Sequence, residues 1–373
     1  MASVLVAGSV AQRPGRGGHA WVFLSYLLGM RRLGHEVHFL DRLTTEMAGV
    51  PAAGLEGSPQ ARWLRRTMES FGLGEDYTLI VGPRSRSAAL ERLRGADLLL
   101  DVNGFLDDPE LLDAAAVSAF VDIDPAIQQM WQALGLAEMF GRHDLHFTVG
   151  ENIGRGGCAV PTCGVEWIAT RPPVVLDQWQ GGPAGERFTS VASWRGPYGS
   201  IEYEGETYGL RAHELRRLLD LPGRVGAELA LALDIDPEDE ADAAALREAG
   251  WGLLDPAAVA GDPGAYRDFV QGSGAELNVA KNVYVRSRCG WFSDRSASYL
   301  ASGRPVLAQD TGYPDNLPTG EGLLRFDGLE EAAAGIEEIR RDWPRHRAAA
   351  RRLAVEHFDS DRVLGEMLDA AAV

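Results

Sequence analysis

The stretch CGWFSDRSASYLASGRPVLAQDTG, residues 289–312, decides the fold class of this chain. A polar turn at residues 293–296 opens a short apolar run, which ends at Gly303. Asp294 fits the N-cap of a helix, and Gly303 fits the position just past its C-terminus. The apolar residues 305–309 that follow predict a buried strand. A loop, a helix, a glycine stop and a strand in this order are typical of an α/β sheet.

The predicted start of this helix has the chemistry of an anion site. Its first turn, Ser293-Asp294-Arg295-Ser296, offers unpaired backbone N–H groups, two hydroxyls and a guanidinium. Helix N-termini carry partial positive charge and suit a phosphate or a diphosphate. We therefore take these four residues as candidates for a nucleotide site. An ordinary capped helix would have the same sequence, so the candidates need independent support.

Length and composition indicate a globular protein of two domains. The 373 residues include 54 Asp and Glu against 36 Lys and Arg, and from the net charge of −18 we expect no nucleic acid and no membrane among its partners. The apolar start is too short for a signal peptide, and no run approaches the ~20 residues of a membrane span. Cys158, Cys163 and Cys289 are too few for a disulfide framework. We expect a cytoplasmic protein.

The first half opens with one βαβ unit. Residues 3–8 predict a strand, 9–18 a glycine-rich loop, 20–33 a helix that Gly34 ends, and 36–40 a second strand. Ligands of such sheets lie beyond the carboxyl ends of the strands, which is where His19 falls, after Gly17 and Gly18. His19 is our candidate for a catalytic base, although a helix-capping or merely exposed histidine would fit too. The glycine spacing does not match a dinucleotide fingerprint.

Two further predicted strands, residues 97–103 and 117–123, end in polar side chains: Asp101 and Asn103 in one, Asp122 and Asp124 in the other. Either Asp122 or Asp124 could orient His19 by accepting a bond from one ring nitrogen. Asp124 precedes Pro125, which favours a helix-capping role, so Asp122 is our candidate partner.

The middle of the chain does not predict a metal site. His143, His146, Cys158 and Cys163 match no familiar zinc spacing, so we assign no metal. Residues 51–74 predict a helical insertion near the mouth of the site. Paired prolines and clustered glycines at residues 171–185 predict the linker between the two domains.

The second half repeats the alternation of strands and helices. Residues 188–194 predict a strand, followed by the loop 195–200, in which Arg195 and backbone amides could approach a diphosphate. Lys281 is a second candidate cation, and Trp194 or Trp291 could stack on a nucleobase, although core packing explains a tryptophan equally well. The predicted fold class is therefore α/β, with two Rossmann-like doubly wound domains facing a central cleft.

An ordered set of motifs resembles bacterial GT-B glycosyltransferases over nearly the whole chain. Its members are Gly17-Gly18-His19 and 34–37 (GHEV) in the first half, then 302–306 (SGRPV), 310–312 (DTG) and 320–323 (GEGL) in the second. The resemblance implies an acceptor domain at residues 1–175, a donor domain at 176–345, and C-terminal helices at 346–373 that pack back on the first domain.

The resemblance also implies an activity, which is transfer of a sugar from a UDP- or dTDP-type nucleotide-sugar to a small-molecule acceptor, of the natural-product type. No other cofactor and no metal would be needed, because helix N-termini and cations replace Mg²⁺. Gly17, Gly18, Gly290, Asp310 and Thr311 complete the implied donor-binding set. The sequence does not indicate an oligomeric state.

One departure from the family pattern keeps other functions open. Many members carry two glutamates eight positions apart that contact ribose and sugar, whereas the matching positions here are Gly290 and Ser298. Asp294 and Arg295 lie inside this window and are candidates to replace them. A sugar-nucleotide epimerase of the same fold, or a non-catalytic protein that binds a nucleotide-sugar or a partner, are the alternatives.

Overall fold

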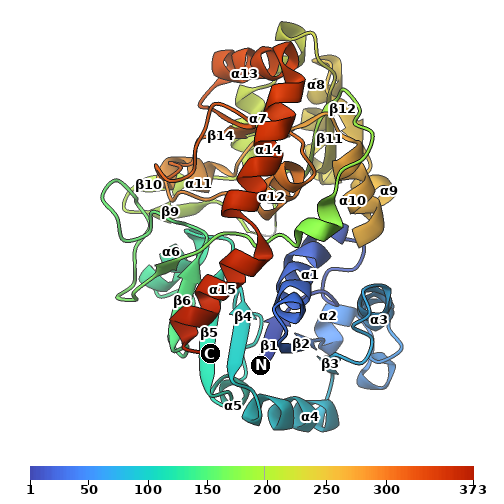
Figure 1. The fold of residues 1–373 in the computed structure, drawn as a ribbon, viewed down its shortest axis with the longest axis vertical. Coiled ribbons are helices and arrows are strands. Elements are labelled where there is room, and N and C mark those ends of the chain that lie inside the picture. The colour runs from blue at the N-terminus through green and yellow to red at the C-terminus, as the bar shows by residue number, and fades with distance from the viewer. Residues whose placement is uncertain (197) are drawn as a thin grey trace.

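The computed structural model describes residues 1–196 and 198–373. Pro197, within the predicted loop 195–200, lies outside the described residues. Two parallel sheets stand one above the other, the first at the bottom of Figure 1 and the second at the top. Their strand orders are β3-β2-β1-β4-β5-β6-β7 and β12-β11-β8-β13-β14-β15. Each is a doubly wound order that reverses beside its first strand, so the predicted fold class is confirmed.

The strands of the first sheet are β1 Ser3–Gly8, β2 Glu36–Arg42, β3 Tyr77–Ile80, β4 Leu98–Val102, β5 Val117–Asp122, β6 Leu145–Thr148 and β7 Ile168–Ala169. Those of the second are β8 Phe188–Ser193, β11 Leu229–Asp234, β12 Gly252–Leu254, β13 Ala275–Asn278, β14 Val306–Gln309 and β15 Leu323–Phe326. A separate antiparallel hairpin pairs β9 Ile201–Tyr203 with β10 Glu206–Tyr208.

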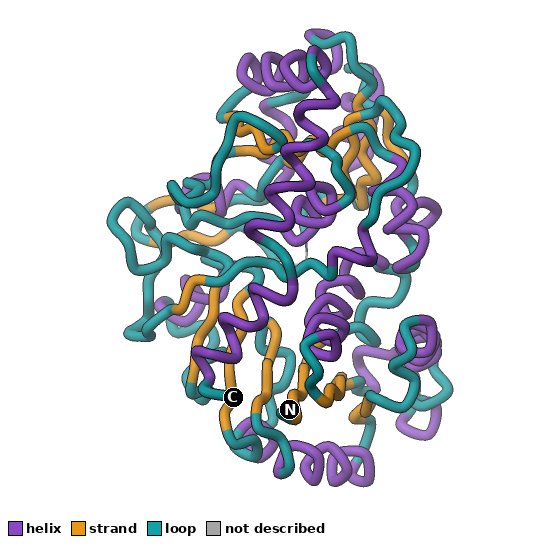
Figure 2. Tube along the Cα trace, in the orientation of Figure 1, coloured by secondary structure: helices purple, strands orange, loops and turns teal. Residues whose placement is uncertain are grey.

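Helices cover the sheets and connect their strands (Figure 2). In the first half they are α1 Gly17–Arg32, α2 Thr45–Ala48, α3 Pro59–Ser70, α4 Pro83–Arg94, α5 Pro109–Leu112 and α6 Ile127–Ala133. In the second half they are α7 Arg211–Arg217, α8 Glu240–Glu248, α9 Pro256–Ala260, α10 Pro263–Gly272, α11 Asn282–Ser287, α12 Asp294–Ala301, α13 Leu329–Arg341, α14 Trp343–His357 and α15 Ser360–Ala371. The short 3₁₀ helices are η1 Ala52–Gly54, η2 Leu176–Trp179, η3 Leu221–Arg224 and η4 Pro237–Asp239.

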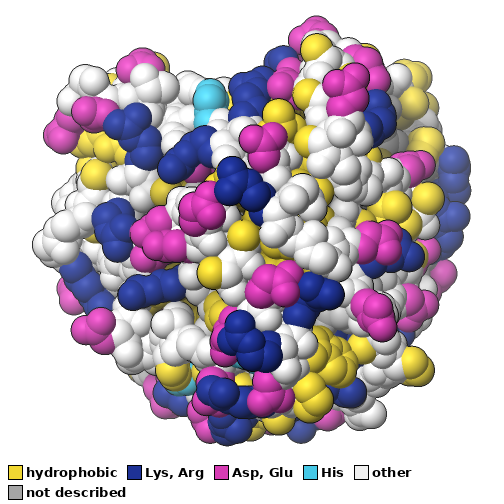
Figure 3. All heavy atoms as spheres, turned by 90° about the horizontal axis from the view of Figure 1, so that it is seen from above, with side chains coloured by type: hydrophobic (Ala, Val, Ile, Leu, Met, Phe, Trp, Pro, Cys, Tyr) yellow, Lys and Arg dark blue, Asp and Glu magenta, His cyan; other side chains and the backbone are white. Residues whose placement is uncertain are grey.

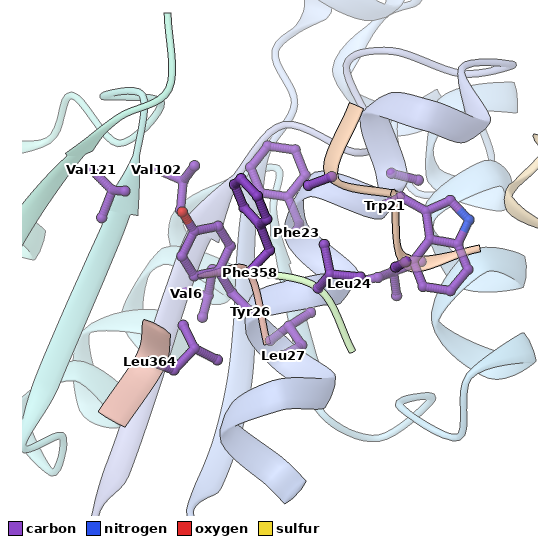
Figure 4. Packing of buried hydrophobic residues seen from close by; sticks show 14 of the residues in the cluster. Val6, Trp21, Phe23, Leu24, Tyr26, Leu27, Val102, Val121, Phe358 and Leu364 are labelled. Carbon is purple, nitrogen blue, oxygen red and sulfur yellow. The ribbon is translucent and has the colours of Figure 1, made fainter. Parts of the chain in front are cut away.

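Helix α1 is the centre of the lower core. Its apolar side chains are buried nearly all round, because the sheet lies on one side and elements from the second half of the chain lie on the other. Figure 4 shows Phe23 and Tyr26 of α1 between Val6 and Val102 of the sheet and Phe358 and Leu364 from the C-terminal end. This packing fixes the N-terminal end of α1, which carries His19.

The C-terminal helix α15 returns to the first half of the chain (Figure 1). It packs on α1 so closely that a Cβ at Gly29 would lie 2.4 Å from Leu364, and Arg32 pairs with Asp361 at 2.9 Å. The preceding helix α14 instead packs on α12 in the second half. The domain limits 1–175, 176–345 and 346–373 stay a prediction.

The two halves share an apolar interface beside the cleft. One buried cluster combines Ile127, Met130 and Ile153 of the first half with Val283 and Trp291 of the second. Buried apolar contacts of this kind restrict the relative motion of two domains. Packed side chains therefore join the two walls of the cleft.

Candidate functional site

A cleft of about 480 Å³ lies between the carboxyl ends of the two sheets. Its size is that of a small-molecule site. From the first half it is lined by residues that include Arg13, Arg16, Gly17, Gly18, His19, Asn103, Phe105 and Asp124, and from the second half by Arg195, Gly196, Tyr198, Arg211, Lys281, Tyr284, Trp291, Ser293, Asp294 and Arg295. The lining includes six Lys and Arg against four Asp, so the cleft is locally cationic in a chain of net charge −18.

The strand order explains why these residues meet. In the first sheet the order reverses between β1, which leads to His19, and β4, which leads to Asn103. In the second sheet it reverses between β8, which leads to Arg195, and β13, which leads to Lys281. Such switch points leave a crevice where ligands bind. Here the two crevices open into one cleft.

His19 is held as a neutral imidazole with one free nitrogen. Its Nε2 lies 3.2 Å from the backbone oxygen of Ser9 and 3.0 Å from the Ser9 hydroxyl. A carbonyl oxygen only accepts, so Nε2 carries the proton and Nδ1 keeps its lone pair. Burial lowers the pKa of His19 to about 4, and Arg13 and Arg16 nearby act in the same direction. The imidazole is therefore uncharged at neutral pH.

The predicted pairing of His19 with Asp122 is wrong, because Asp122 bonds elsewhere. The Asp122 carboxylate is fully buried and accepts bonds from Gln129 Nε2 at 2.8 Å and from Thr148 Oγ1 at 2.7 Å. Burial raises its pKa to about 7. Asp122 also accepts the N–H of Asp124 at 3.2 Å, so it supports the turn that carries Asp124 into the cleft. The Ser9 carbonyl orients His19 instead.

The start of α12 differs from the prediction. Ser293, not Asp294, is the N-cap, and its hydroxyl accepts the N–H of Arg295 at 3.2 Å. Asp294 is the first helical residue, and its side chain is exposed within the cleft, whose walls reduce its contact with bulk water. This desolvation raises the pKa of Asp294. A carboxylate of the chain thus already lies at this helix N-terminus.

Arg295 is already neutralised by the protein. Its guanidinium donates to Glu276 at 2.6 Å, to Asn278 at 2.7 Å and to the Val191 carbonyl at 2.8 Å. The next residue of α12, Ser296, is fully buried, and its hydroxyl accepts a hydrogen bond from the Asn278 amide at 2.9 Å. Arg295 lines the cleft as a rigid element, whereas Ser296 does not line it.

Three other predicted donor residues lie in two adjoining loops, which are joined by a hydrogen bond of 2.8 Å from the Gly290 N–H to the Thr311 carbonyl, and do not line the cleft. Asp310 accepts the N–H of Gly312 at 2.7 Å, and the fully buried Thr311 donates its hydroxyl to the Trp291 carbonyl at 2.7 Å. Gly290 has φ +77° and packs against Asn152. The side chains of Asp310 and Thr311 are thus committed to local structure, as is the backbone of Gly290. The implied contact of Asp310 with sugar hydroxyls is not supported by this geometry.

The two candidate tryptophans have different surroundings. Trp194 is 1% exposed within the core of the second half and does not line the cleft, so its predicted role in stacking on a base is wrong. Trp291 lines the cleft and stacks on Tyr284, with ring centroids 4.3 Å apart. Trp291 stays a candidate.

Gly17 and Gly18 let the two halves approach each other at the mouth of the cleft. A Cβ at Gly17 would lie 2.1 Å from the Asp262 carbonyl oxygen, and one at Gly18 would lie 2.8 Å from the Tyr266 ring. Any larger residue would force apart the N-terminus of α1 and helices α9 and α10. Both glycines line the cleft as predicted candidates.

The two candidate cations Arg195 and Lys281 both have carboxylate partners. Arg195 pairs with Asp239 at 2.6 Å beside the cleft. Lys281 reaches across to the other half, where its Nζ lies 2.8 Å from both Asp124 oxygens, and Asp124 also accepts the Tyr284 hydroxyl. Two of the three ammonium N–H groups are thus engaged, and the third is available to a ligand.

The Asp124–Lys281 pair is expected to contribute strongly to stability. Its side chains are only 19% and 13% exposed, so Lys281→Met leaves a largely buried carboxylate without its cation, at a cost of about 2–4 kcal/mol. The exposed pair Arg16–Asp234 also joins the halves and is a matched control, expected below about 1 kcal/mol. Urea unfolding of both double-mutant cycles measures the two coupling energies. Equal coupling in the two cycles would contradict this prediction.

Arg211, which the sequence did not single out, is a buried cation of the cleft without a carboxylate partner among the described residues. It is 6% exposed and donates to the carbonyls of Val279 at 2.8 Å and Ser193 at 3.0 Å. Among the residues the structure describes, no carboxylate lies within 4.0 Å of its guanidinium. Burial lowers the pKa of Arg211 to about 10, and Arg295 nearby adds to this effect. The sequence gives no sign of this role, because Arg211 is one of several arginines on a short helix.

No group of three or more His, Cys, Asp or Glu side chains in residues 1–196 and 198–373 has a geometry that could hold a metal ion. Within these ranges, no helix has the length and apolar character needed to cross a membrane.

Comparison with solved structures finds this fold in glycosyltransferases. An α-glucosyltransferase solved with UDP-glucose and DNA containing an abasic site matches 100% of this chain and 99% of its own, with a TM-score of 0.62 at 13% identity. HepE from Anabaena, solved with UDP-glucose, matches 99% of this chain and 100% of its own, with a TM-score of 0.59 at 12% identity. No family model and no curated protein matches the sequence. The resemblance to the GT-B fold is thereby confirmed.

The expectation of no nucleic-acid partner is corrected by the same comparison. An α-glucosyltransferase of this fold is solved with a 13-mer DNA, with a TM-score of 0.63 at 13% identity. The net charge of −18 averages over the whole surface and does not describe a local site. Figure 3 shows Lys and Arg side chains interspersed with Asp and Glu on one face. Net charge alone was therefore an insufficient ground for the exclusion.

Proposed function

We propose that this protein is a glycosyltransferase that moves a sugar from a nucleoside diphosphate sugar to an acceptor hydroxyl in the cleft between its sheets. The observation that carries the proposal is Arg211, a buried guanidinium without a carboxylate partner among the described residues, at the switch point of the second sheet. Arginine is well suited to bind phosphate oxygens. The likeness of the fold to structures that hold UDP and UDP-glucose supports the same ligand class.

The residues divide the reaction between them. Arg211 and the third N–H of Lys281 stabilise the charge that develops on the leaving diphosphate, as a metal ion would. His19 Nδ1 takes the proton of the acceptor hydroxyl as that oxygen bonds to the sugar carbon and the bond to the diphosphate breaks. The Ser9 carbonyl holds the imidazole in the required tautomer. UDP or dTDP is the predicted nucleotide.

The transfer experiment described below compares two classes of acceptor, small molecules and DNA. A small-molecule acceptor stays a prediction from the sequence. DNA is included in the test, because structures of the same fold hold DNA.

A thermal-shift screen tests the donor half of the proposal. We expect one of UDP, dTDP, GDP and ADP to stabilise the protein equally with and without EDTA, by about 2.7 kcal/mol at 100 times its Kd. A response to NAD alone, or to no nucleotide, would sink the proposal.

The transfer half follows with the matching glucose donor. The acceptors are a panel of small alcohols and a 13-mer duplex, and glycosylated product is detected by mass spectrometry. Release of nucleoside diphosphate without glycosylated product would favour the epimerase alternative instead.

A further inference from the structure

Asn103 follows β4 in a backbone conformation that few side chains adopt. Its φ is +67°, and Gly104 after it has φ +70°. Residues other than glycine occupy this region at a cost in free energy and persist there where the surrounding structure enforces it, often at binding sites. A glycine at position 103 would adopt the same turn at lower cost. Asparagine tolerates this conformation better than most side chains, so its amide group, rather than the turn, is what points to a binding role.

The Asn103 amide lies in the cleft without a partner. The residue is 6% exposed, and its Oδ1 is buried with no hydrogen bond. Only its backbone groups are bonded among the described residues. A buried amide without a partner is unfavourable, because it has lost water and gained no bond. A ligand in the cleft would supply that bond.

Three contacts hold the turn rigidly. The N–H of Asn103 donates to the Val121 carbonyl at 2.8 Å, and its carbonyl accepts the Gln128 amide at 3.2 Å. Asp101 accepts the N–H of Leu106 at 3.3 Å and is itself paired with the buried His143 at 3.2 Å. The amide is thus presented in one fixed position, as a binding contact requires.

The position of Asn103 indicates which part of the ligand it reads. It faces the cleft from the first sheet beside His19, whereas Arg211 and Lys281 face it from the second. An amide both donates and accepts, which suits a neutral hydroxyl better than a phosphate. With the diphosphate on the cations, the sugar is the part that reaches the first sheet. We propose that Asn103 hydrogen-bonds the donor sugar, an inference that rests on the proposed function.

Asn103→Gly and Asn103→Ala test this role by calorimetric titration with UDP and UDP-glucose, or with dTDP and dTDP-glucose if the donor screen selects dTDP. We expect an unchanged Kd for the nucleoside diphosphate and a Kd about tenfold higher for its glucose conjugate in both variants. The melting temperature should stay at or above that of the wild type in Asn103→Gly and fall in Asn103→Ala, because alanine keeps the strain.

Glu204→Gly is the matched control. Glu204 has φ +52° in the exposed turn between β9 and β10, so the change relieves strain away from the cleft and should alter neither Kd. If the Asn103 variants bind both ligands equally more weakly, or bind both as tightly as the wild type, the sugar contact is overturned. The proposed function is still upheld in that case, provided that the wild-type protein binds the nucleotide. Absence of binding by the wild-type protein overturns both.

Discussion

Replacing His19 by alanine is expected to lower sugar transfer by about 10²–10⁴-fold and to leave the Kd for the nucleoside diphosphate within about twofold. In the proposed mechanism the lone pair of Nδ1 accepts the proton of the acceptor hydroxyl, whereas cations of the other sheet would hold the diphosphate. Initial rates at saturating donor, together with calorimetric titration of the nucleotide, measure the two quantities separately. Full activity in His19→Ala would remove the base assignment.

His38 provides the matched control for this experiment. It is a buried histidine whose pKa, like that of His19, is lowered by desolvation to about 4, but it bonds Thr78 at 2.9 Å and does not line the cleft. His38→Gln should therefore keep the wild-type rate.

The pH profile gives a second readout of His19. A base with a pKa near 4 stays neutral as the pH falls from 8 to about 5.5, so the rate should not decline through this range because of His19. An acid limb near pH 6.5 that disappears in His19→Ala would instead show an ordinary histidine pKa and contradict the buried environment.

The fold could be predicted because the chain marks its elements locally. Residues 289–312 carry a helix start, a glycine stop and an apolar strand, and the structure has α12 and β14 there. The N-cap was misplaced by one residue. Ser293 and Asp294 both have side chains that cap helices, and only the backbone conformation decides between them.

The site could be predicted only where strand ends determine it. His19, Arg195 and Lys281 follow strands beside the switch points, and the doubly wound order brings them to one cleft. Strand ends do not reveal where a side chain points. Asp122, the last residue of β5, turns into the interior, whereas Asp124 two residues later reaches the cleft.

Partners distant in sequence could not be predicted. Asp124 and Lys281 are 157 positions apart, and nothing in either local sequence indicates their pairing. Arg211 was missed for a related reason. On a short helix with Arg216 and Arg217 it looks like a solvated charge, and only the packing of α7 beneath the cleft shows that it is buried.

Arg211→Met is expected to weaken nucleoside diphosphate binding by about 100-fold. Two charge-assisted hydrogen bonds to phosphate oxygens, at about 1.5 kcal/mol or more each, would be lost together with a buried positive charge of the cleft. Methionine keeps most of the side-chain volume, so the loss is electrostatic rather than a packing defect. Calorimetric titration with UDP or dTDP measures the affinity, and a thermal melt reports whether the fold persists.

Two companion variants separate charge from geometry. Arg217→Met removes a 60%-exposed arginine from the same helix and should leave the affinity unchanged. Arg211→Lys keeps the charge but loses the fork that reaches Val279 and Ser193, so its affinity should lie between those of the wild type and Arg211→Met. Wild-type affinity in Arg211→Met would place the diphosphate elsewhere. An equal loss of affinity in Arg217→Met would contradict a specific contact between Arg211 and the diphosphate. Arg217 is exposed and cannot make that contact, so α7 would then act through its overall charge.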